Sequence, residues 1–319
     1  MKIVAGLGSV DEYIPYVQAG ADELFCGYVP YNWTKKYGTV LPLNRREVLA
    51  YNVQLGSFSE LEILSAMIRK YRKPVHIAMN SLYYIPEQYE EIADIVKQCM
   101  KIGFDSFILA DPALILYLRQ KGISCKIHLS GEAGEMNREA IKVFREMGIG
   151  RIIFHRKNTV ASMRQMIEAV NAEKLEFEAF ALNELCQFTG AFCNSLHCDE
   201  MGYLCRTTYW GDAEMEERME RVRKRTLEIE EQQEQQYLCG KSGCALCVLP
   251  QLEAAGITHL KLVGRGNYVE DMIRDIRNLK AVLGVLEGNQ REKKETGRYI
   301  DQLNKKIFDG QPCGYNCIY

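Results

Sequence analysis

Cysteine residues gather in one stretch of this chain, and their spacing is typical of metal binding. Seven of the 12 cysteines lie there, namely Cys186, Cys193, Cys198, Cys205, Cys239, Cys244 and Cys247. The pairs Cys193–Cys198 and Cys244–Cys247 have the short separations that structural zinc sites use. Iron–sulfur clusters also bind four thiolates, with spacings that vary more between families. The spacing therefore predicts a metal site and leaves zinc and iron–sulfur both open.

The composition favours metal binding over disulfides. The 319 residues include 40 basic and 42 acidic ones, so the net charge of −2 gives no overall attraction for nucleic acid or an anionic membrane. The start, "MKIVAGLGSVDEY", lacks the apolar region of a signal peptide, and no apolar run approaches the roughly 18 residues of a membrane span. We therefore expect a cytoplasmic protein, in which clustered cysteines bind metal more often than they form disulfides.

Apolar runs and amphipathic segments alternate along most of the chain, and this alternation predicts the fold class. The expected strands are 2–8, 22–28, 74–80, 105–110, 125–130, 150–156, 176–182 and 258–265. Helical spacing of apolar residues follows nearly all of them. Eight strand–helix units suit a closed (β/α)8 barrel of the α/β class. An open doubly wound sheet is the alternative, although no Gly-x-Gly-x-x-Gly run follows a strand.

One long connection divides the expected single domain into parts. It separates the seventh strand from the eighth, and a connection of such length in a compact domain usually has a function. We assign 1–182 and 256–290 to the barrel, 183–255 to a cysteine-rich insertion and 291–319 to a polar tail. The insertion contains a strongly charged segment, 214–236, which is predicted to be a solvated helix.

The C-terminal ends of the predicted strands carry polar side chains that could do chemistry. In a parallel barrel these ends meet at one face, where such barrels place their functional groups. The residues are Asn80, Asp111, His128, Ser130, Glu132, His155, Arg156 and Arg265. Because Cys186 follows the seventh strand, we expect the cysteine-rich insertion to lie over the same face.

Several stretches, as far as residue 285, resemble peptidase family U32, the collagenase-like peptidases. The matching segments are "AGADELFCG", "DSFILADPALILYLRQKG", "KIHLSGEAGEMNREAIKVFREMGIGRIIFHR", "ALNELCQFTGAFC" and "CALCVLPQLEAAGITHLKLVGR". Family members include proteins of anaerobic ubiquinone hydroxylation and of tRNA and ribosomal RNA hydroxylation. The chain departs from the family pattern in "FTGAFC" and "HLSGE".

The resemblance implies a 4Fe-4S cluster and oxygen-independent hydroxylation. Cys247 and Cys239 are alternatives to Cys244 as the fourth cluster ligand, and zinc is the alternative to the 4Fe-4S cluster. Prephenate is the implied oxygen donor, and the acceptor is a small molecule, an RNA or a peptide. Matched onto the family's motif, the cluster ligands are Cys186, Cys193, Cys205 and Cys244.

A dicarboxylate donor needs cationic partners, and the strand ends supply them. We expect Arg156 and Arg265 to bind its carboxylates, with Ser130 beside them. His128 and His155 are candidates for proton transfer near neutral pH, and structural hydrogen bonding is the alternative for both.

Asp111 is a further catalytic candidate, and it is equally suited to cap the helix that begins at Pro112.

Two other functions remain open. The family's name implies a peptidase, although the chain contains neither a His-Glu-x-x-His nor a Gly-x-Ser-x-Gly motif. The second of these functions is that of a non-catalytic subunit, which carries the cluster and works with a homologous partner protein. The even charge balance and the lack of an aromatic–basic stripe favour a small-molecule or peptide-borne substrate over RNA.

Overall fold

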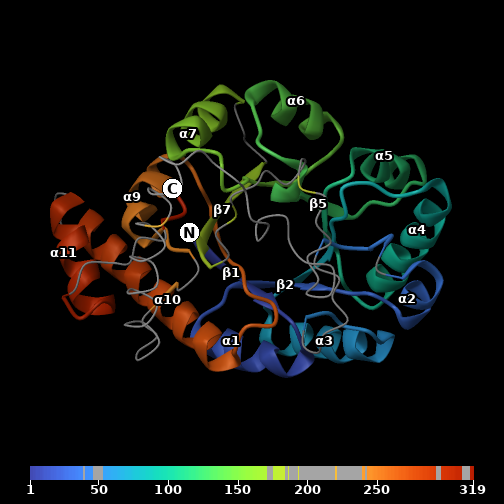
Figure 1. Ribbon diagram of the computed structural model, residues 1–319, viewed down its shortest axis with the longest axis horizontal. Coiled ribbons are helices and arrows are strands. Elements are labelled where there is room, and N and C mark those ends of the chain that lie inside the picture. The colour runs from blue at the N-terminus through green and yellow to red at the C-terminus, as the bar shows by residue number, and fades with distance from the viewer. Residues whose placement is uncertain are drawn as a thin grey trace.

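Eight parallel strands close into a barrel (Figure 1). The computed structural model describes residues 1–38, 40–45, 53–170, 175–183, 186, 193, 220, 239–240, 243–291, 296–310 and 317–319. The strands are β1 (Lys2–Leu7), β2 (Glu23–Gly27), β3 (Val75–Met79), β4 (Ser106–Leu109), β5 (Lys126–Leu129), β6 (Arg151–Ile153), β7 (Glu176–Leu182) and β8 (His259–Leu262). Each strand pairs with the next, and β8 pairs with β1. This closure confirms the predicted (β/α)8 barrel and excludes the open sheet.

Helices form a ring around the barrel (Figure 1). They are α1 (Tyr13–Ala19), α2 (Tyr31–Tyr37), α3 (Phe58–Tyr71), α4 (Pro86–Lys101), α5 (Pro112–Gln120), α6 (Arg138–Glu146), α7 (Val160–Ala169), α9 (Leu249–Ala254), α10 (Val269–Arg291) and α11 (Thr296–Ile307). Three of them, α2, α9 and α11, were not anticipated from periodicity. The segment predicted as a charged helix, 214–236, lies outside the described residues apart from Glu220.

The helices begin where the sequence supplies caps. Ser57 and Glu60 form a capping box at α3, because each side chain accepts the other residue's backbone N–H. Proline occupies the first turn of α4 and α5, where its missing N–H costs no hydrogen bond. Asn137 caps α6 by accepting two backbone N–H groups. Local sequence therefore defines the starts of several barrel helices.

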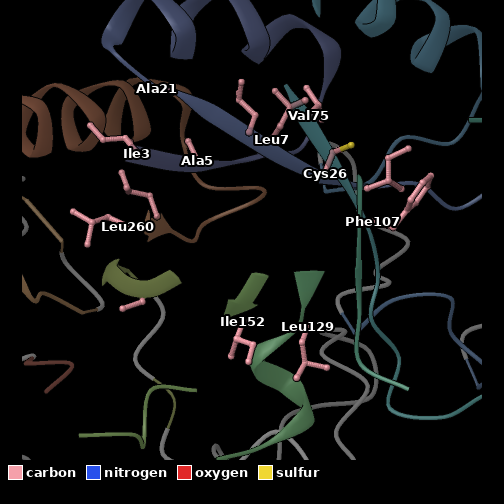
Figure 2. Packing of buried hydrophobic residues seen from close by; sticks show 14 of the residues in the cluster. Ile3, Ala5, Leu7, Ala21, Cys26, Val75, Phe107, Leu129, Ile152 and Leu260 are labelled. Carbon is pink, nitrogen blue, oxygen red and sulfur yellow. The ribbon is translucent and has the colours of Figure 1, made fainter. Parts of the chain in front are cut away.

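The strands bury side chains on both faces. Successive side chains point to opposite sides of a strand, so alternate residues face the helices and the barrel interior. Figure 2 shows Ile3 and Leu7 of β1 directed away from the barrel centre, with Leu129 and Ile152 directed away from it on the opposite wall. All four are fully buried. Burial between strands and helices accounts for most of the hydrophobic core.

The barrel interior is arranged in levels. On β2, Glu23 is followed at every second position by Phe25 and Gly27. The chain repeats this order of charged, apolar and polar levels with Lys261 on β8 and Val263 and Arg265 directly after it. The lower level is charged. The middle level is an apolar cluster to which Phe25 and Val263 belong. The upper level is polar and forms the mouth, which we define as the C-terminal ends of the strands and the residues directly after them.

A helix anchors both ends of the cysteine-rich insertion. Asp275 of α10 is fully buried and accepts hydrogen bonds from Asn183 Nδ2 at 2.7 Å and from the Gly240 backbone N–H at 3.2 Å. Asn183 directly follows β7 and has a φ of 69°. One carboxylate thus joins the point where the chain leaves the barrel to a point near its return.

Candidate functional site

Three buried arginines lie at the mouth, in the polar upper level of the barrel. Arg45, Arg156 and Arg265 are 9%, 8% and 6% exposed. Arg45 donates from Nε to Glu132 at 3.3 Å, and its backbone N–H donates to Asn80 Oδ1. Buried guanidinium groups are costly unless paired or able to bind an anion. The mouth is therefore a cationic environment that is partly neutralised by Glu132.

Arg265 lies in an amide-lined corner of the mouth. Its Nη1 donates to Gln54 Oε1 at 3.1 Å, and Gln54 exchanges two side-chain hydrogen bonds with the fully buried Asn44. A Cβ at Gly27 would collide with Gln54 Oε1 and Arg265 Nη1, so a larger residue there would displace both side-chain ends. The predicted substrate-binding residue Arg265 is thus held in position by the connection after β2.

Arg156 lies over an aromatic ring on the β6–β7 side of the mouth. Its Cζ is 3.8 Å from the centroid of the Phe180 ring. Burial lowers the pKa of Arg156, and the charges of Glu132, Cys186 and Tyr319 oppose this shift. Within the described residues its Nε has no hydrogen-bond partner. A buried donor without a partner is costly, and a bound anion would satisfy it.

His155, beside Arg156, has one buried nitrogen that is also unsatisfied. Its Nδ1 accepts from the Lys157 backbone N–H at 3.2 Å. Its Nε2 lacks a hydrogen-bond partner among the residues that the structure describes. Burial lowers the pKa of His155, and the neighbouring Arg156 acts in the same direction. At neutral pH the ring is therefore neutral, and because Nδ1 accepts a hydrogen bond, the ring proton lies on Nε2, which is a hydrogen-bond donor.

Ser130 and Asp111 both perform local structural roles. Ser130 Oγ accepts hydrogen bonds from Asn80 Nδ2 and the Glu132 backbone N–H, each at 3.2 Å. Asp111 caps α5 through the Ala113 N–H at 2.8 Å and accepts from the Tyr89 hydroxyl at 2.9 Å. Ser130 lies within the mouth. Asp111 has the capping contact that its position before Pro112 predicted.

His128 lies below the mouth, inside the charged lower level of the barrel. Its ring packs edge-on against His76, with 4.5 Å between centroids. The next residue on that face of β5, Ser130, reaches the mouth, so His128 lies one level deeper than the strand-end position expected from the sequence. It is 4% exposed, and burial, followed by the charges of His76 and Arg151, holds its pKa well below the usual value.

Charged side chains surround His128 in a connected network. Arg151 donates to Glu23, Glu176 and Glu178 at 2.8 to 3.0 Å, and Lys261 donates to Glu178 at 2.9 Å. Burial alone would raise the pKa of Glu23, but hydrogen bonds from His259 and His76 and the charge of Arg151 hold it well below its usual range. This network fills the lower level of the barrel with buried ion pairs rather than with apolar side chains.

We expect the network to make the protein labile to acid. Burial lowers the pKa values of His76 and His128, so the unfolded chain binds more protons below about pH 6.5 and stability falls as the pH drops through that value. The depressed pKa values of Glu23 and Glu178 add a second loss below about pH 4.5. Urea midpoints between pH 7.5 and 4 measure both losses. His128→Leu should flatten the upper part of the profile, and a wild-type midpoint that does not change from pH 7.5 to 5 would contradict the account.

Two predicted cluster ligands are tied to the end of β7. Cys186 lies four residues after Leu182, within roughly 14 Å of extended chain. Cys244 forms an antiparallel bridge with Leu182, supported by hydrogen bonds from Asn183 N to Gly243 O and from Ala245 N to Ala181 O. Half-buried thiols at one strand end are a donor set that fits an iron–sulfur cluster or zinc.

The other cysteines of the insertion lie in different surroundings. Cys193 is buried, whereas Cys205 and Cys198 lie outside the described residues. Cys239 is buried near Asp275. Cys247 lies three residues after Cys244, on the 3-10 helix η5 (Leu246–Val248). Among the described residues, no group of three or more His, Cys, Asp or Glu side chains is arranged to hold a metal ion. The four-cysteine assignment therefore stays a prediction.

The structure also brings residues to the mouth that sequence reasoning missed. Asn44, Arg45 and Gln54 come from the long connection between β2 and α3, and Tyr319 comes from the tail. The connection after β2 begins at the same face of the barrel as the connections after the other strands. Its polar segment "LNRR" therefore could have been used to predict residues of the mouth. Nothing in the pattern of the tail pointed to the barrel.

The fold and mouth define a (β/α)8 barrel protein with a cationic mouth and a cysteine-bearing connection after its seventh strand. The sequence model of a known family, Peptidase family U32, matches residues 8–314. The chain belongs to this family, which confirms the resemblance.

Curated relatives of the chain carry names that refer to tRNA. It is 22% identical over 214 residues to "tRNA hydroxylation protein P1" of Bacillus subtilis (strain 168), covering 66% of this chain and 46% of the relative. It is 25% identical over 174 residues to "tRNA hydroxylation protein P" of Escherichia coli (strain K12), covering 54% and 34%. The chain therefore spans less than half the length of these relatives.

Solved structures with a similar arrangement include the U32 peptidase Mk0906, with a TM-score of 0.41 and 14% identity over 57% of this chain and 69% of that one. A dihydrodipicolinate synthase from Bacillus clausii has a TM-score of 0.48 and 9% identity, covering 93% and 77%.

In the described part of the chain, no helix is long and apolar enough to cross a membrane.

Proposed function

We propose that this protein is an iron–sulfur enzyme that hydroxylates RNA without molecular oxygen and takes the oxygen atom from a small dicarboxylate such as prephenate. The observation that carries the proposal is the mouth, where Arg45, Arg156 and Arg265 are buried around the strand ends. Membership of the family and the names of the tRNA hydroxylation relatives support the reaction class and the RNA acceptor.

The mouth residues would bind and orient the donor. Arg156 and Arg265 offer planar pairs of N–H donors, which match a carboxylate better than lysine does. The ring of Phe180 lies under the Arg156 guanidinium and provides an apolar surface for the carbon skeleton of the donor. In the neutral ring His155 Nε2 carries the proton, because Nδ1 accepts the Lys157 backbone N–H, so Nε2 would donate a hydrogen bond to the bound acid.

Cysteine thiolates would hold the cofactor next to these groups. Cys186 and Cys244 at the end of β7, with Cys193 and Cys205 from the insertion, are the proposed ligands. A bound cluster supplies one-electron redox chemistry and a Lewis-acidic iron. Arg156 lies close enough to Cys186 for the charges of the two side chains to influence each other. The donor site and the cofactor would therefore be neighbours.

The cofactor prediction is tested by preparing the protein without oxygen. We expect iron and acid-labile sulfide in equal amounts and a brown protein. Serine at Cys186, Cys193, Cys205 or Cys244 should lower the iron content, whereas Cys125→Ser, a buried core position, should not. A colourless protein that holds zinc even after anaerobic reconstitution with iron and sulfide would refute the proposal. Full iron in Cys244→Ser would move the fourth ligand to Cys247 or Cys239.

The acceptor is tested with the same preparation. Incubation with prephenate and unmodified tRNA should add one oxygen atom to a nucleoside, as measured by mass spectrometry. Parallel incubations with a peptide library and with candidate small molecules distinguish the other acceptors. Peptide cleavage that survives loss of the metal would favour a peptidase. Activity that requires a homologous partner protein would indicate a cluster-bearing subunit.

A further inference from the structure

The last described residues of the tail, Cys317–Tyr319, lie against the barrel at the end of β7, with Cys317 exposed, Ile318 buried and Tyr319 half-buried. Ile318 is 7% exposed and belongs to the apolar cluster of the middle level, with Phe25, Ile108 and Phe180. In Figure 1 the C mark lies beside β7 and α9. A hydrophobic side chain at this position closes the middle level from above. The tail is therefore part of the wall of the mouth.

Backbone hydrogen bonds fix the path of these residues. The Ile318 N–H donates to Cys244 O at 3.0 Å, and Cys317 forms a parallel bridge with Cys244. Cys244 is in turn bridged to Leu182 at the end of β7. The segment is thus the outer member of a short pairing that extends from the barrel, and its position does not depend on side-chain packing alone.

Tyr319 inserts its hydroxyl group into the barrel wall. The Phe180 N–H donates to Tyr319 Oη at 3.1 Å. This N–H is available because β6 pairs with β7 only as far as Glu178, and the register of β7 with β8 shifts between Phe180 and Leu182. Burial raises the pKa of Tyr319, so the phenol keeps its proton at neutral pH.

The hydroxyl group has a hydrogen left to donate. A phenol accepts and donates, and the Phe180 N–H uses only its accepting capacity. Within the described part of the chain, that N–H is the hydrogen-bond partner of Tyr319 Oη. Arg156 lies close enough for its charge to lower the pKa of Tyr319, and its own Nε is buried without a partner among the same residues. Both side chains contact Phe180, Arg156 at its ring and Tyr319 at its backbone N–H, so two unused donors lie on the same β6–β7 wall.

We propose that Tyr319 is a ligand-binding residue, and that its O–H and the Arg156 guanidinium together bind one carboxylate group of a small organic acid. A carboxylate accepts several hydrogen bonds and is strengthened by a charged donor, so it satisfies both groups at once. The rings of Phe180 and Tyr319 and the side chain of Ile318 offer an apolar surface beside it. The inference deepens the proposed function, since it assigns a binding residue to the donor, but it concerns binding alone.

The test compares two tyrosine-to-phenylalanine variants of the full-length, anaerobically prepared protein. Tyr319→Phe keeps the ring and removes the O–H. Tyr299→Phe is the matched control, because the Tyr299 hydroxyl is buried in the same tail and donates to the backbone oxygen of Leu246, within the main hydrophobic core. Calorimetric titrations use prephenate, malonate and inorganic phosphate as separate probes. We expect Tyr319→Phe to bind the carboxylates about 10-fold more weakly or worse, and Tyr299→Phe to bind them as the wild type does.

Each other outcome is decisive. Equal affinity in Tyr319→Phe and the wild type, or equal losses in both variants, would overturn the inference. Failure of the wild type to bind either carboxylate would do so too. Tighter carboxylate binding after deletion of residues 317–319 would show that the tail blocks the site instead of contributing to it. Phosphate binding alone that depends on Tyr319 would refute the carboxylate class. Malonate binding that depends on Tyr319, without prephenate binding, would support Tyr319 while rejecting the proposed oxygen donor.

Discussion

Replacing Arg151 by methionine is expected to lower the free energy of unfolding by about 3–5 kcal/mol. The Arg151 side chain is 3% exposed and contacts Glu23, Glu176 and Glu178. Of these, Glu23 and Glu178 are themselves buried, so the variant leaves two carboxylates in the barrel without their main cation. Lys261 would remain as a partner for Glu178. Urea denaturation at pH 7.5 measures the loss.

A matched variant separates this effect from a general effect of removing arginine. Arg164→Met removes an exposed ion pair with Glu168 on α7, and it should cost less than about 0.5 kcal/mol. The deficit of Arg151→Met should also shrink as the pH is lowered toward 4, because protonation neutralises the unpaired carboxylates. Similar losses in the two variants, or a deficit that does not depend on pH, would show that the network is not the source of stability.

Replacing Arg156 by glutamine is expected to reduce kcat/KM for the proposed hydroxylation by about 100-fold. Truncating one member of a buried charged contact with a ligand costs about 2–5 kcal/mol. The free energy of unfolding should change little, because Arg156 Nε has no hydrogen-bond partner within the described structure and its guanidinium lies over the Phe180 ring. Steady-state kinetics with prephenate as the varied substrate measures the change.

Two further variants sharpen this prediction. Arg156→Lys keeps the charge but loses the planar pair of donors, so we expect intermediate activity. Arg138→Gln, an exposed position on α6, should behave as the wild type does. If Arg156→Gln retains more than half of the activity while Arg265→Gln loses it, the carboxylate site lies on the Arg265 side of the mouth.

The strands and the barrel followed from sequence because local and global requirements agree there. Runs such as 176–182 bury both faces, and the same residues then form β7. The positions of Arg156, Arg265 and Ser130 at the mouth followed from the same reasoning, since a parallel barrel gathers strand ends at one face. Periodicity therefore predicts which residues reach the mouth whenever they directly follow a strand.

Contacts made by irregular segments could not be predicted in this way. Arg45 reaches the mouth from the connection between β2 and α3, and Tyr319 reaches it through the pairing of the tail with Cys244 and the hydrogen bond from the Phe180 N–H. His128 shows a different limit. The sequence places both His128 and Ser130 at the end of the predicted strand 125–130, and it did not reveal that Ser130 faces the mouth while His128 lies one level deeper. Depth within a barrel depends on register, which sequence alone does not specify.

The most direct test of the central claim is the mass of tRNA nucleosides after anaerobic incubation with prephenate and the iron-loaded protein. The account predicts that a nucleoside gains one oxygen atom, that the gain carries the label when prephenate is labelled with heavy oxygen, and that Arg156→Gln largely abolishes it. Unmodified nucleosides with the wild-type protein, in a preparation whose iron and sulfide content is complete, would contradict the claim that this barrel hydroxylates RNA.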